Sequence, residues 1–347
     1  MDEGEEMGQL INTEIDTLLK DTSRSFFVTL EMLPKNIRRQ VGLLYLLARV
    51  ADTIADTKSG SAERLIEALT QYDSVVQGDS NELPDFSEIA SLQEHEGEAR
   101  LMENVGPAVL ALELFGEDDK VLMRECLAII ISGQTLDLQR FGPANETGSV
   151  SPLQTDVELD DYAYRVAGSV GDFWTHMTCN HILNHSFSVG EKRERLFSLG
   201  LRFGKALQMI NILRDIPEDL RFGRCYIPVD SMQKYGLKPS DLIEPDNMEK
   251  FRPLYDRYLD LTDAHLDAAV EYISMLPYSQ FRLRAACMLP VLIGQRTVAM
   301  LREQNVLDSE NRVKVSRVEM KDLISKTKRS LILPGGGRRL MISNRNR

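Results

Sequence analysis

The chain has 347 residues, of which 43% are hydrophobic and 27% are charged. That composition can build a sizeable core, so a wholly disordered chain is excluded. Acidic residues outnumber basic ones by 53 to 41, and the resulting net charge of −12 argues against nucleic acid as a partner, because phosphates require a surplus of Lys and Arg.

The N-terminal segment and the cysteines predict a cytoplasmic protein. Residues 1–6 are acidic and lack the basic-then-apolar order of a secretory signal. The longest apolar runs, such as 41–48, fall far short of the roughly 18 residues that cross a bilayer. The four cysteines are scattered without a CxxC pair, which favours reduced thiols. We therefore expect a soluble protein, or at most a peripheral one at a membrane surface.

Most long segments have the hydrophobic periodicity of helices. Apolar residues of the segment 43–54 recur at spacings of three and four, and the segment 201–213 follows the same pattern more loosely. Two stretches, 77–98 and 141–155, contain Gly and Pro and are predicted to be loops. Neither loop separates halves with independent cores. We predict an all-α protein with a single domain over residues 1–320.

A first polar stripe lies in the apolar segment 44–56. Its side chains are spaced by four, three and four residues, so they share one face of a helix: Tyr45, Arg49, Asp52 and Asp56. Two carboxylates on so apolar a helix must face a wet cavity or be buried at considerable cost. A surface ion pair between Arg49 and the aspartates is the competing interpretation.

A second polar stripe, spaced by three, four and four residues, occurs further along the chain: Gln208, Asn211, Asp215 and Asp219. Arg214 adjoins it. Pro217 lacks a backbone N–H and is predicted to kink or end the helix between the two aspartates. One DxxxD spacing arises by chance in many helices, whereas two of them on polar stripes of apolar helices predict a shared chemistry.

That chemistry is metal-assisted handling of a diphosphate. Mg²⁺ takes a few carboxylates and fills its other positions with water and phosphate oxygens. Carboxylates one helical turn apart can present oxygens to such ions, and arginines can complete the neutralisation of a leaving diphosphate. A carbocation left behind would need an apolar pocket that excludes water.

The C-terminal segment 321–347 has eight basic residues and one acidic residue, which leaves a net charge of −19 on the first 320 residues. Gly335 to Gly337 follow Pro334 and predict that the tail is partly flexible. A solvated tail is one interpretation. Contact with an anionic membrane surface is the other.

Four segments in the order 22–26, 45–56, 162–171 and 211–228 resemble the squalene/phytoene synthase family. They read TSRSF, YLLARVADTIAD, YAYRVAGSVG and NILRDIPEDLRFGRCYIP. The resemblance implies an isoprenoid synthase fold, with helices around a central cavity and the two aspartate pairs facing across it. It also implies head-to-head (1′–1) condensation of two prenyl diphosphates through a cyclopropylcarbinyl diphosphate.

The resemblance also implies roles for individual residues. Asp52, Asp56, Asp215 and Asp219 would bind Mg²⁺ and diphosphate. Tyr162 would accept a proton or guide the substrate during cyclopropane formation. Further side chains would contact the diphosphate or line the site: Arg24, Ser25, Tyr45, Arg49, Gln208, Asn211, Arg214 and Arg224. Gly168 and Gly171 leave room for a polyprenyl chain or for close helix packing, and packing is the commoner use.

The resemblance leaves the product open between two kinds of reaction. Residues 313–317 resemble the basic VKxxx stretch of squalene synthases, so Lys314 and Arg317 would contact the phosphates of NADPH. On that basis we expect squalene from two farnesyl diphosphates. Phytoene or dehydrosqualene, made without NADPH, is the alternative, because Ala55 stands where many eukaryotic squalene synthases have an acid. A non-catalytic assembly protein is the rival from another class, although such relatives lose their aspartates. The oligomeric state stays open.

Overall fold

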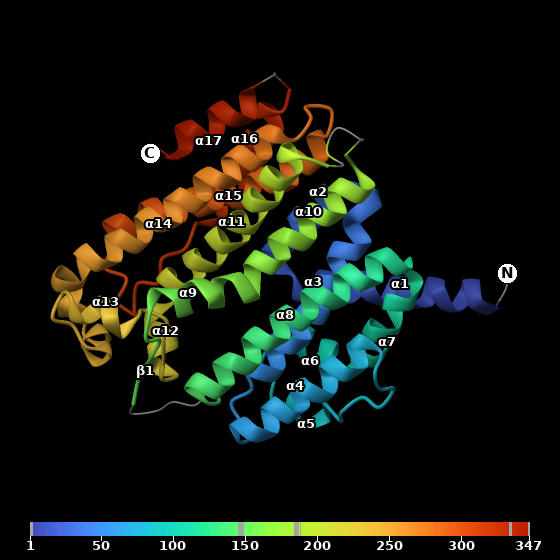
Figure 1. Cartoon of the computed structure of the whole chain (residues 1–347), viewed down its shortest axis with the longest axis horizontal. Coiled ribbons are helices and arrows are strands. Elements are labelled where there is room, and N and C mark those ends of the chain that lie inside the picture. Colours follow the sequence, from blue (N-terminus) through green and yellow to red (C-terminus); the bar gives the residue numbers. More distant parts are fainter. Residues whose placement is uncertain (1–2, 145–148, 184–186, 188, 333–334, 346–347) are drawn as a thin grey trace. The chain divides into compact units, whose positions relative to one another are not determined.

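The computed structural model describes residues 3–144, 149–183, 187, 189–332 and 335–345, with the side chains of residues 3–12, 24 and 25 left outside the description. The described chain is helical almost throughout, which confirms the all-α prediction (Figure 1). Its contacts divide it into two compact units, residues 1–145 with 176–181, and residues 146–175 with 182–347. The prediction of a single domain over 1–320 stays a prediction.

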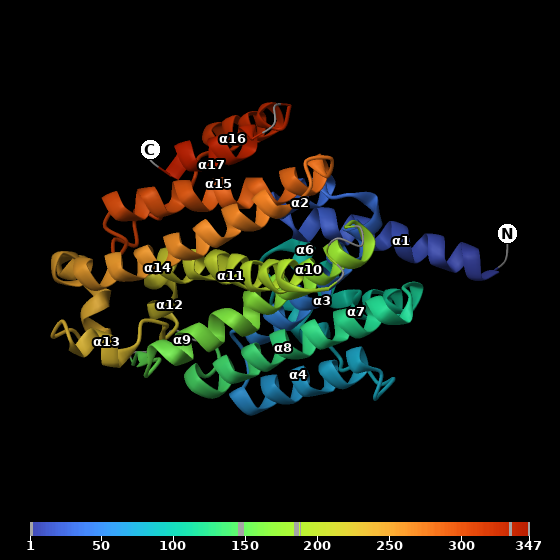
Figure 2. The same cartoon turned by 45° about the horizontal axis from the view of Figure 1, so that its top comes forward.

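The first unit is built around α3, a long helix with apolar residues on most of its surface. Leu43, Leu47 and Ile54 of the predicted pattern are buried, and α3 packs against α4 and α8. Figure 2 shows α4 and α8 side by side. The elements of this unit are α1 (Glu3–Thr22), α2 (Arg24–Met32), α3 (Lys35–Ala55), α4 (Ala62–Gln77), α5 (Ser87–Ser91), α6 (Glu96–Glu103), α7 (Val105–Leu110), η1 (Ala111–Leu114) and α8 (Glu117–Phe141).

The second unit begins with a short parallel pairing of β1 (Ser151–Pro152) with β2 (Arg224–Cys225). Between and after these strands the chain is helical. The elements that follow β1 are α9 (Asp156–Ala163), the π-helix η2 (Tyr164–Gly168), α10 (Ser169–His181), α11 (Glu191–Arg214) and α12 (Ile216–Arg221), and the last residues of α10, 176–181, belong to the first unit. Those after β2 are α13 (Val229–Gln233), η4 (Pro239–Ile243), η5 (Pro245–Asn247), α14 (Met248–Met275), α15 (Phe281–Glu303), α16 (Arg317–Ser330) and α17 (Gly336–Arg345).

The core of the second unit lies between α11, α14 and α15, which pack against one another. Tyr255 and Tyr258 of α14 are fully buried there. The Tyr255 hydroxyl donates to the carbonyl of Leu213, 2.9 Å away, and so anchors α14 to the end of α11. This hydrogen bond fixes the position of the C-terminal end of α11, directly before the second aspartate pair.

Both predicted loops contain short regular elements. The segment 77–98 includes α5 and the start of α6, and Gly78 ends α4 with a positive φ of 87°. In the segment 141–155, Gly142 ends α8 with a positive φ of 76° and β1 follows. The segment 321–347 contains most of α16 and all of α17, which pack against α15, and Figure 2 shows them over that helix.

Candidate functional site

The first aspartate pair lies at the end of α3. Asp52 accepts a hydrogen bond from the Nε2 of Gln134 on α8, and its carboxylate is 3.9 Å from the guanidinium of Arg49. Arg49 also pairs with Glu98 at 2.5 Å. Asp56 is exposed just past the last residue of α3. The stripe therefore has one partly enclosed carboxylate and one that faces solvent.

Burial raises the pKa of Asp52 to about 6, with a further increase from the neighbouring Asp56 carboxylate. Arg49 and the hydrogen bond from Gln134 oppose this shift without cancelling it. The side chain is 34% exposed, so the carboxylate is open to solvent on one side while protein surrounds the rest. A carboxylate in this setting is favoured in its charged form when an additional cation binds.

Arg49 is surrounded by acids. Burial alone would lower its pKa, but Asp52 and Glu98 outweigh burial and raise the pKa well above its usual value. Arg49 therefore stays charged at neutral pH. The Tyr45 hydroxyl, one turn earlier on α3, donates to the carbonyl of Thr22 at 3.2 Å, so Tyr45 holds the end of α1 close to this stripe.

The second aspartate pair lies at a break between two helices. As predicted from Pro217, α11 ends at Arg214, and α12 begins at Ile216 with the proline in its first turn. Asp215 caps the end of α11, and the backbone N–H of Asp219 donates to its carbonyl at 3.0 Å. The two aspartates thus stay one turn apart although the helix is interrupted between them.

Two arginines hold Asp215. Arg214 donates from Nε to Oδ1 of Asp215 at 2.9 Å and from Nη2 to Oδ2 at 2.5 Å. Arg312 donates from Nη2 to Oδ1 at 2.7 Å and pairs with Glu218 at 3.2 Å. Burial on its own would raise the pKa of Asp215, but these guanidinium groups lower it below its usual value. Asp215 is therefore fully ionised at neutral pH.

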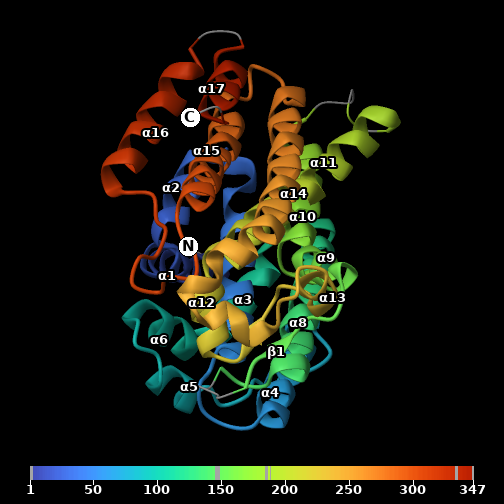
Figure 3. The ribbon, with the colours of Figure 1, turned by 90° about the vertical axis from the view of Figure 1, so that its left-hand side faces the viewer.

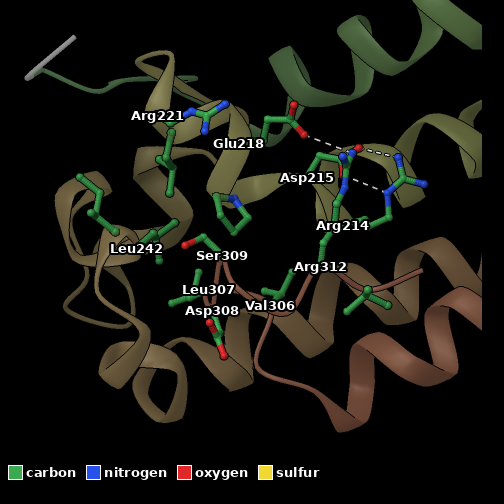
Figure 4. Close-up of a pocket in the computed structure, with 14 residues that line it drawn as sticks. Arg214, Asp215, Glu218, Arg221, Leu242, Val306, Leu307, Asp308, Ser309 and Arg312 are labelled. Carbon is green, nitrogen blue, oxygen red and sulfur yellow. Dashed lines mark hydrogen bonds and ion pairs between the residues drawn. The ribbon is translucent and has the colours of Figure 1, made fainter. Parts of the chain in front are cut away.

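A cavity of about 640 Å³, which Asp215 helps to line, opens in the second unit (Figure 4). Its walls come from α12, from η4 and from the segment 306–313, and Arg221 adds a third guanidinium to those of Arg214 and Arg312. The apolar wall includes Leu242 and Val306. Figure 4 shows Arg214 and Arg312 on either side of Asp215. The cavity combines carboxylates that could hold a cation with arginines that could hold an anion.

Tyr162 lies in the last turn of α9 and is buried. Its ring stacks on that of Tyr226, with 4.6 Å between the ring centroids and 19° between the planes. Tyr226 follows β2, so the strand pairing of β1 with β2 brings the two predicted motifs, 162–171 and 211–228, together in one unit. Arg224, in β2, is buried as well.

Glycines bring two segments of the second unit into direct backbone contact. A Cβ at Gly171 would lie 2.0 Å from the carbonyl oxygen of Gly200, and one at Gly204 would lie 2.0 Å from that of Ala167. No side chain fits at such a distance. Gly171 therefore serves close packing between α10 and α11, which was the commoner of its two predicted uses. At Gly168 the nearest atom, on Tyr164, would be 3.2 Å away.

The structure groups the predicted site residues by unit. In the first unit α3 brings together Tyr45, Arg49, Asp52 and Asp56. In the second unit Asn211 joins the Asp215 cluster by accepting from Arg214 at 3.1 Å, and Gln208 is half-buried one turn earlier. Lys314 and Arg317 are exposed and follow directly after the cavity wall. The side chains of Arg24 and Ser25 lie outside the described residues.

Three residues that the sequence did not indicate contact the predicted site residues: Glu98 pairs with Arg49, Gln134 with Asp52 and Arg312 with Asp215. Glu98 lies in a segment that was predicted to be a loop. Gln134 and Arg312 are far from their partners in sequence. A helical projection of residues 117–141 could have placed Gln134 and Asp137 three residues apart on one polar face, whereas no local pattern indicates Arg312.

The donor set of the aspartate pairs suits Mg²⁺, a hard cation that takes carboxylate oxygens and keeps waters or phosphate oxygens. Asp52, with its raised pKa and a second carboxylate one turn away, is the clearest indication of a site that a cation would stabilise. Within the described residues, no three His, Cys, Asp or Glu side chains converge on one point. The carboxylates instead pair with Arg49, Arg214 and Arg312.

Comparison with known proteins identifies relatives of this chain. A family model described as squalene/phytoene synthase matches residues 19–319. A bifunctional lycopene cyclase/phytoene synthase of Arthroderma gypseum is 31% identical over 90% of this chain and 49% of its own length. A squalene synthase of Bos taurus is 27% identical over 74% of this chain and 56% of its own length. The chain spans about half the length of the curated relatives that it matches.

The fold also matches solved structures. A structure of TcSQS in complex with a ligand superposes with a TM-score of 0.77 at 18% identity, covering 96% of this chain and 89% of that one. At that identity the likeness concerns the fold, and it agrees with the all-helical architecture described above.

Proposed function

Since this chain belongs to the squalene/phytoene synthase family, we propose that it joins two prenyl diphosphates head to head (1′–1) through a cyclopropylcarbinyl diphosphate. The observation that carries this proposal is that each unit presents an aspartate pair one helical turn apart with an arginine beside it. A protein that had lost catalysis would have no reason to keep both pairs. The rival proposal of a non-catalytic assembly protein therefore has no support in the residues.

The aspartates and arginines divide the handling of diphosphate between them. Mg²⁺ held by Asp52, Asp56, Asp215 and Asp219 would act as a Lewis acid that stabilises the leaving diphosphate. Arg49 and Arg214 would neutralise the remaining phosphate charge, because a guanidinium fork matches phosphate oxygens. In the protein without ligands these arginines pair with the same carboxylates. Substrate would thus replace an ion pair that already orders both side chains.

Tyr162 is the proposed group that accepts a proton, or guides the substrate, as the cyclopropane ring closes. Its burial and its stacking on Tyr226 support this role, because a phenol in an apolar setting can act without competition from bulk water. The paired rings would also present π-faces to a passing carbocation. Arg224, buried in the neighbouring strand, is proposed to contact the diphosphate together with Gln208 and Asn211.

Squalene is the proposed product when NADPH is present. NADPH supplies the hydride that this product requires and the other products do not. The support is the position of the basic segment: Arg312 and Val313 line the same cavity as Asp215, and Lys314 and Arg317 follow exposed. A cofactor phosphate bound by Lys314 and Arg317 would therefore lie close to the second aspartate pair.

Phytoene or dehydrosqualene is the second candidate product. The phytoene synthase relative at 31% identity favours it, because that is a higher identity than the 27% of the squalene synthase relative. Ala55 favours this second product too, because many eukaryotic squalene synthases have an acid at this position. This position is buried in α3 beside the first aspartate pair, so an acid there would add a costly third charge to that end of the helix.

The deciding experiment is incubation with farnesyl diphosphate or geranylgeranyl diphosphate and Mg²⁺, with and without NADPH, followed by product identification. Squalene that forms from the C15 substrate only when NADPH is added would support the squalene assignment. An unsaturated C30 or C40 product that is unaffected by NADPH would move the assignment to dehydrosqualene or phytoene. No condensed product from either substrate would overturn the proposed reaction.

A further inference from the structure

The C-terminal segment is a docked pair of helices. Thr327 of α16 and Met341 of α17 are fully buried, and Arg345 pairs with Asp267 of α14. Asn344 donates to the carbonyl of Leu292 on α15 at 3.1 Å. These contacts hold α16 and α17 against the second unit. The basic residues of this segment are therefore presented from fixed positions on the unit.

Two turns meet at one end of the second unit. The turn between α14 and α15 and the turn after α16 lie together in Figures 1 and 3. The hydroxyl of Tyr278, in the first turn, donates to the carbonyl of Leu331, in the second, at 2.6 Å. The hydrogen bond joins segments 53 residues apart and fixes them as one surface.

This surface has exposed apolar side chains. Ile332 is 74% exposed, Phe281 is 58% exposed and Tyr278 is 44% exposed. Scattered exposed apolar residues are ordinary on a soluble protein, whereas a cluster on adjoining turns indicates an interaction site. Tyr278 also has the amphipathic ring that is typical of the boundary between a membrane and water.

Exposed basic residues stand close in sequence to this surface. The sequence has no acidic residue from 272 to 302 or from 323 to 345, and the second stretch has six basic residues. Lys328 and Arg329, in the last turn of α16, are exposed a few residues before Ile332. The remainder of the chain is acidic, so this end differs in sign from the molecule as a whole. We call Tyr278, Phe281, Lys328, Arg329 and Ile332 the basic-apolar tip.

We propose that the basic-apolar tip docks the protein on a membrane surface that contains anionic lipids. Phe281, Tyr278 and Ile332 would enter the headgroup and upper acyl region, while Lys328 and Arg329 would pair with lipid phosphates. Charge complementarity selects this occupant, because two exposed cations, Lys328 and Arg329, stand close to the apolar side chains in a molecule that is acidic as a whole. No helix among the described residues is long and apolar enough to cross a bilayer, so binding would be peripheral and reversible.

The test is co-sedimentation of the full chain with phosphatidylcholine vesicles that contain phosphatidylserine, compared with vesicles of phosphatidylcholine alone. We expect binding to the anionic vesicles that declines as salt increases. The double variant Phe281→Ser/Ile332→Ser removes the apolar contribution, and we expect its partition coefficient to fall by about tenfold or more. Lys328→Glu/Arg329→Glu should lose the preference for anionic vesicles. The assay contains no substrate, so its result is independent of the proposed reaction.

Val157→Ser is the matched control. Val157 is 77% exposed, as Ile332 is, but it lies on α9 among acidic residues. Its variant should bind vesicles as the unmodified protein does. Equal binding to neutral and anionic vesicles, or unchanged binding of the Phe281→Ser/Ile332→Ser variant with an unchanged melting temperature, would overturn the proposal. A dimer that the same variant converts to a monomer, without vesicle binding, would assign the tip to self-association instead.

Discussion

Arg312 and Asp215 are 97 residues apart in the sequence, yet Nη2 of Arg312 lies 2.7 Å from Oδ1 of Asp215. The same guanidinium is 3.2 Å from Glu218, and its side chain is largely exposed. Arg312 thus places a positive charge at the carboxylate where the proposed reaction would place a metal ion. An exposed arginine can move away at little cost, because such ion pairs contribute at most about 1 kcal/mol.

Replacing Arg312 with Ala should tighten Mg²⁺ binding in the absence of substrate. Asp215 would lose a competing cation, and an exposed pair of this kind corresponds to about a two- to fivefold change in affinity. Isothermal titration calorimetry measures this directly. The control is Arg302→Ala, since Arg302 also bridges two carboxylates, Asp260 and Asp263, but does not line the cavity. Unchanged or weaker Mg²⁺ binding in Arg312→Ala would show that Arg312 does not occupy the cation position.

Replacing Asp52 or Asp215 with Asn should abolish most turnover and leave the fold intact. Each change keeps the shape of the side chain but removes a charge proposed to hold the metal, so we expect a loss of about a hundredfold or more in turnover. Steady-state kinetics and circular dichroism together separate loss of chemistry from loss of structure. Asp118→Asn, at an exposed position in the first turn of α8, is the control. Full activity in either site variant would contradict the proposal that Asp52 and Asp215 bind the metal ion.

Replacing Gly204 with Ala should destabilise the protein strongly. The new Cβ would lie 2.0 Å from the carbonyl oxygen of Ala167, which is backbone and cannot rotate away. We expect a loss of at least about 2 kcal/mol in the free energy of unfolding, measured by urea denaturation. Gly106→Ala is the comparison, because its Cβ would meet Leu83 at an ordinary 3.5 Å. Similar stability of the two variants would argue against glycine-dependent packing between these segments.

His265 should lower the stability of the protein between pH 6.5 and pH 4, whereas protonation of Asp52, whose pKa is raised to about 6, acts in the opposite direction. Burial lowers the pKa of His265 to about 4, with further lowering from Arg202 and Lys205. In this window the unfolded chain takes up a proton at His265 and the folded chain does not, so acid favours unfolding. The contribution is about 2–3 kcal/mol across the window.

The variant His265→Gln should remove that part of the pH dependence. Chemical denaturation at several pH values gives the slope of unfolding free energy against pH for both proteins. A slope that is the same in the variant would show that His265 is not responsible.

The helices and one face of the first site could be predicted from local pattern. The spacing of Tyr45, Arg49, Asp52 and Asp56 on an apolar segment indicated α3, and its buried residues follow that pattern. The helix break at Pro217 was predictable for the same reason, since proline lacks the N–H that a continuous helix needs. Both are local effects of sequence on backbone geometry.

Contacts between distant segments could not be predicted in this way. Arg312 lies in the irregular segment between α15 and α16, so no periodicity directs it to Asp215, from which it is separated by 97 residues. The segment around Gly335 contains the glycines of a flexible tail, but the buried Met341 and the Arg345–Asp267 pair hold α17 in place. Tertiary contacts, which no local sequence pattern reveals, determine both the position of Arg312 and that of α17.

The central claim is that the protein forms a bond between the two C1 carbons of its substrates. Incubation with Mg²⁺, NADPH and an equal mixture of farnesyl diphosphate labelled with ¹³C at C1 and farnesyl diphosphate labelled with both ¹³C and deuterium at C1, followed by ¹³C NMR of the extracted product, tests it directly. We expect one-bond ¹³C–¹³C coupling in product made from one molecule of each, because the two labelled carbons become neighbours in a 1′–1 product and the deuterium makes them inequivalent. A condensed product without that coupling would place the new bond elsewhere and contradict the account.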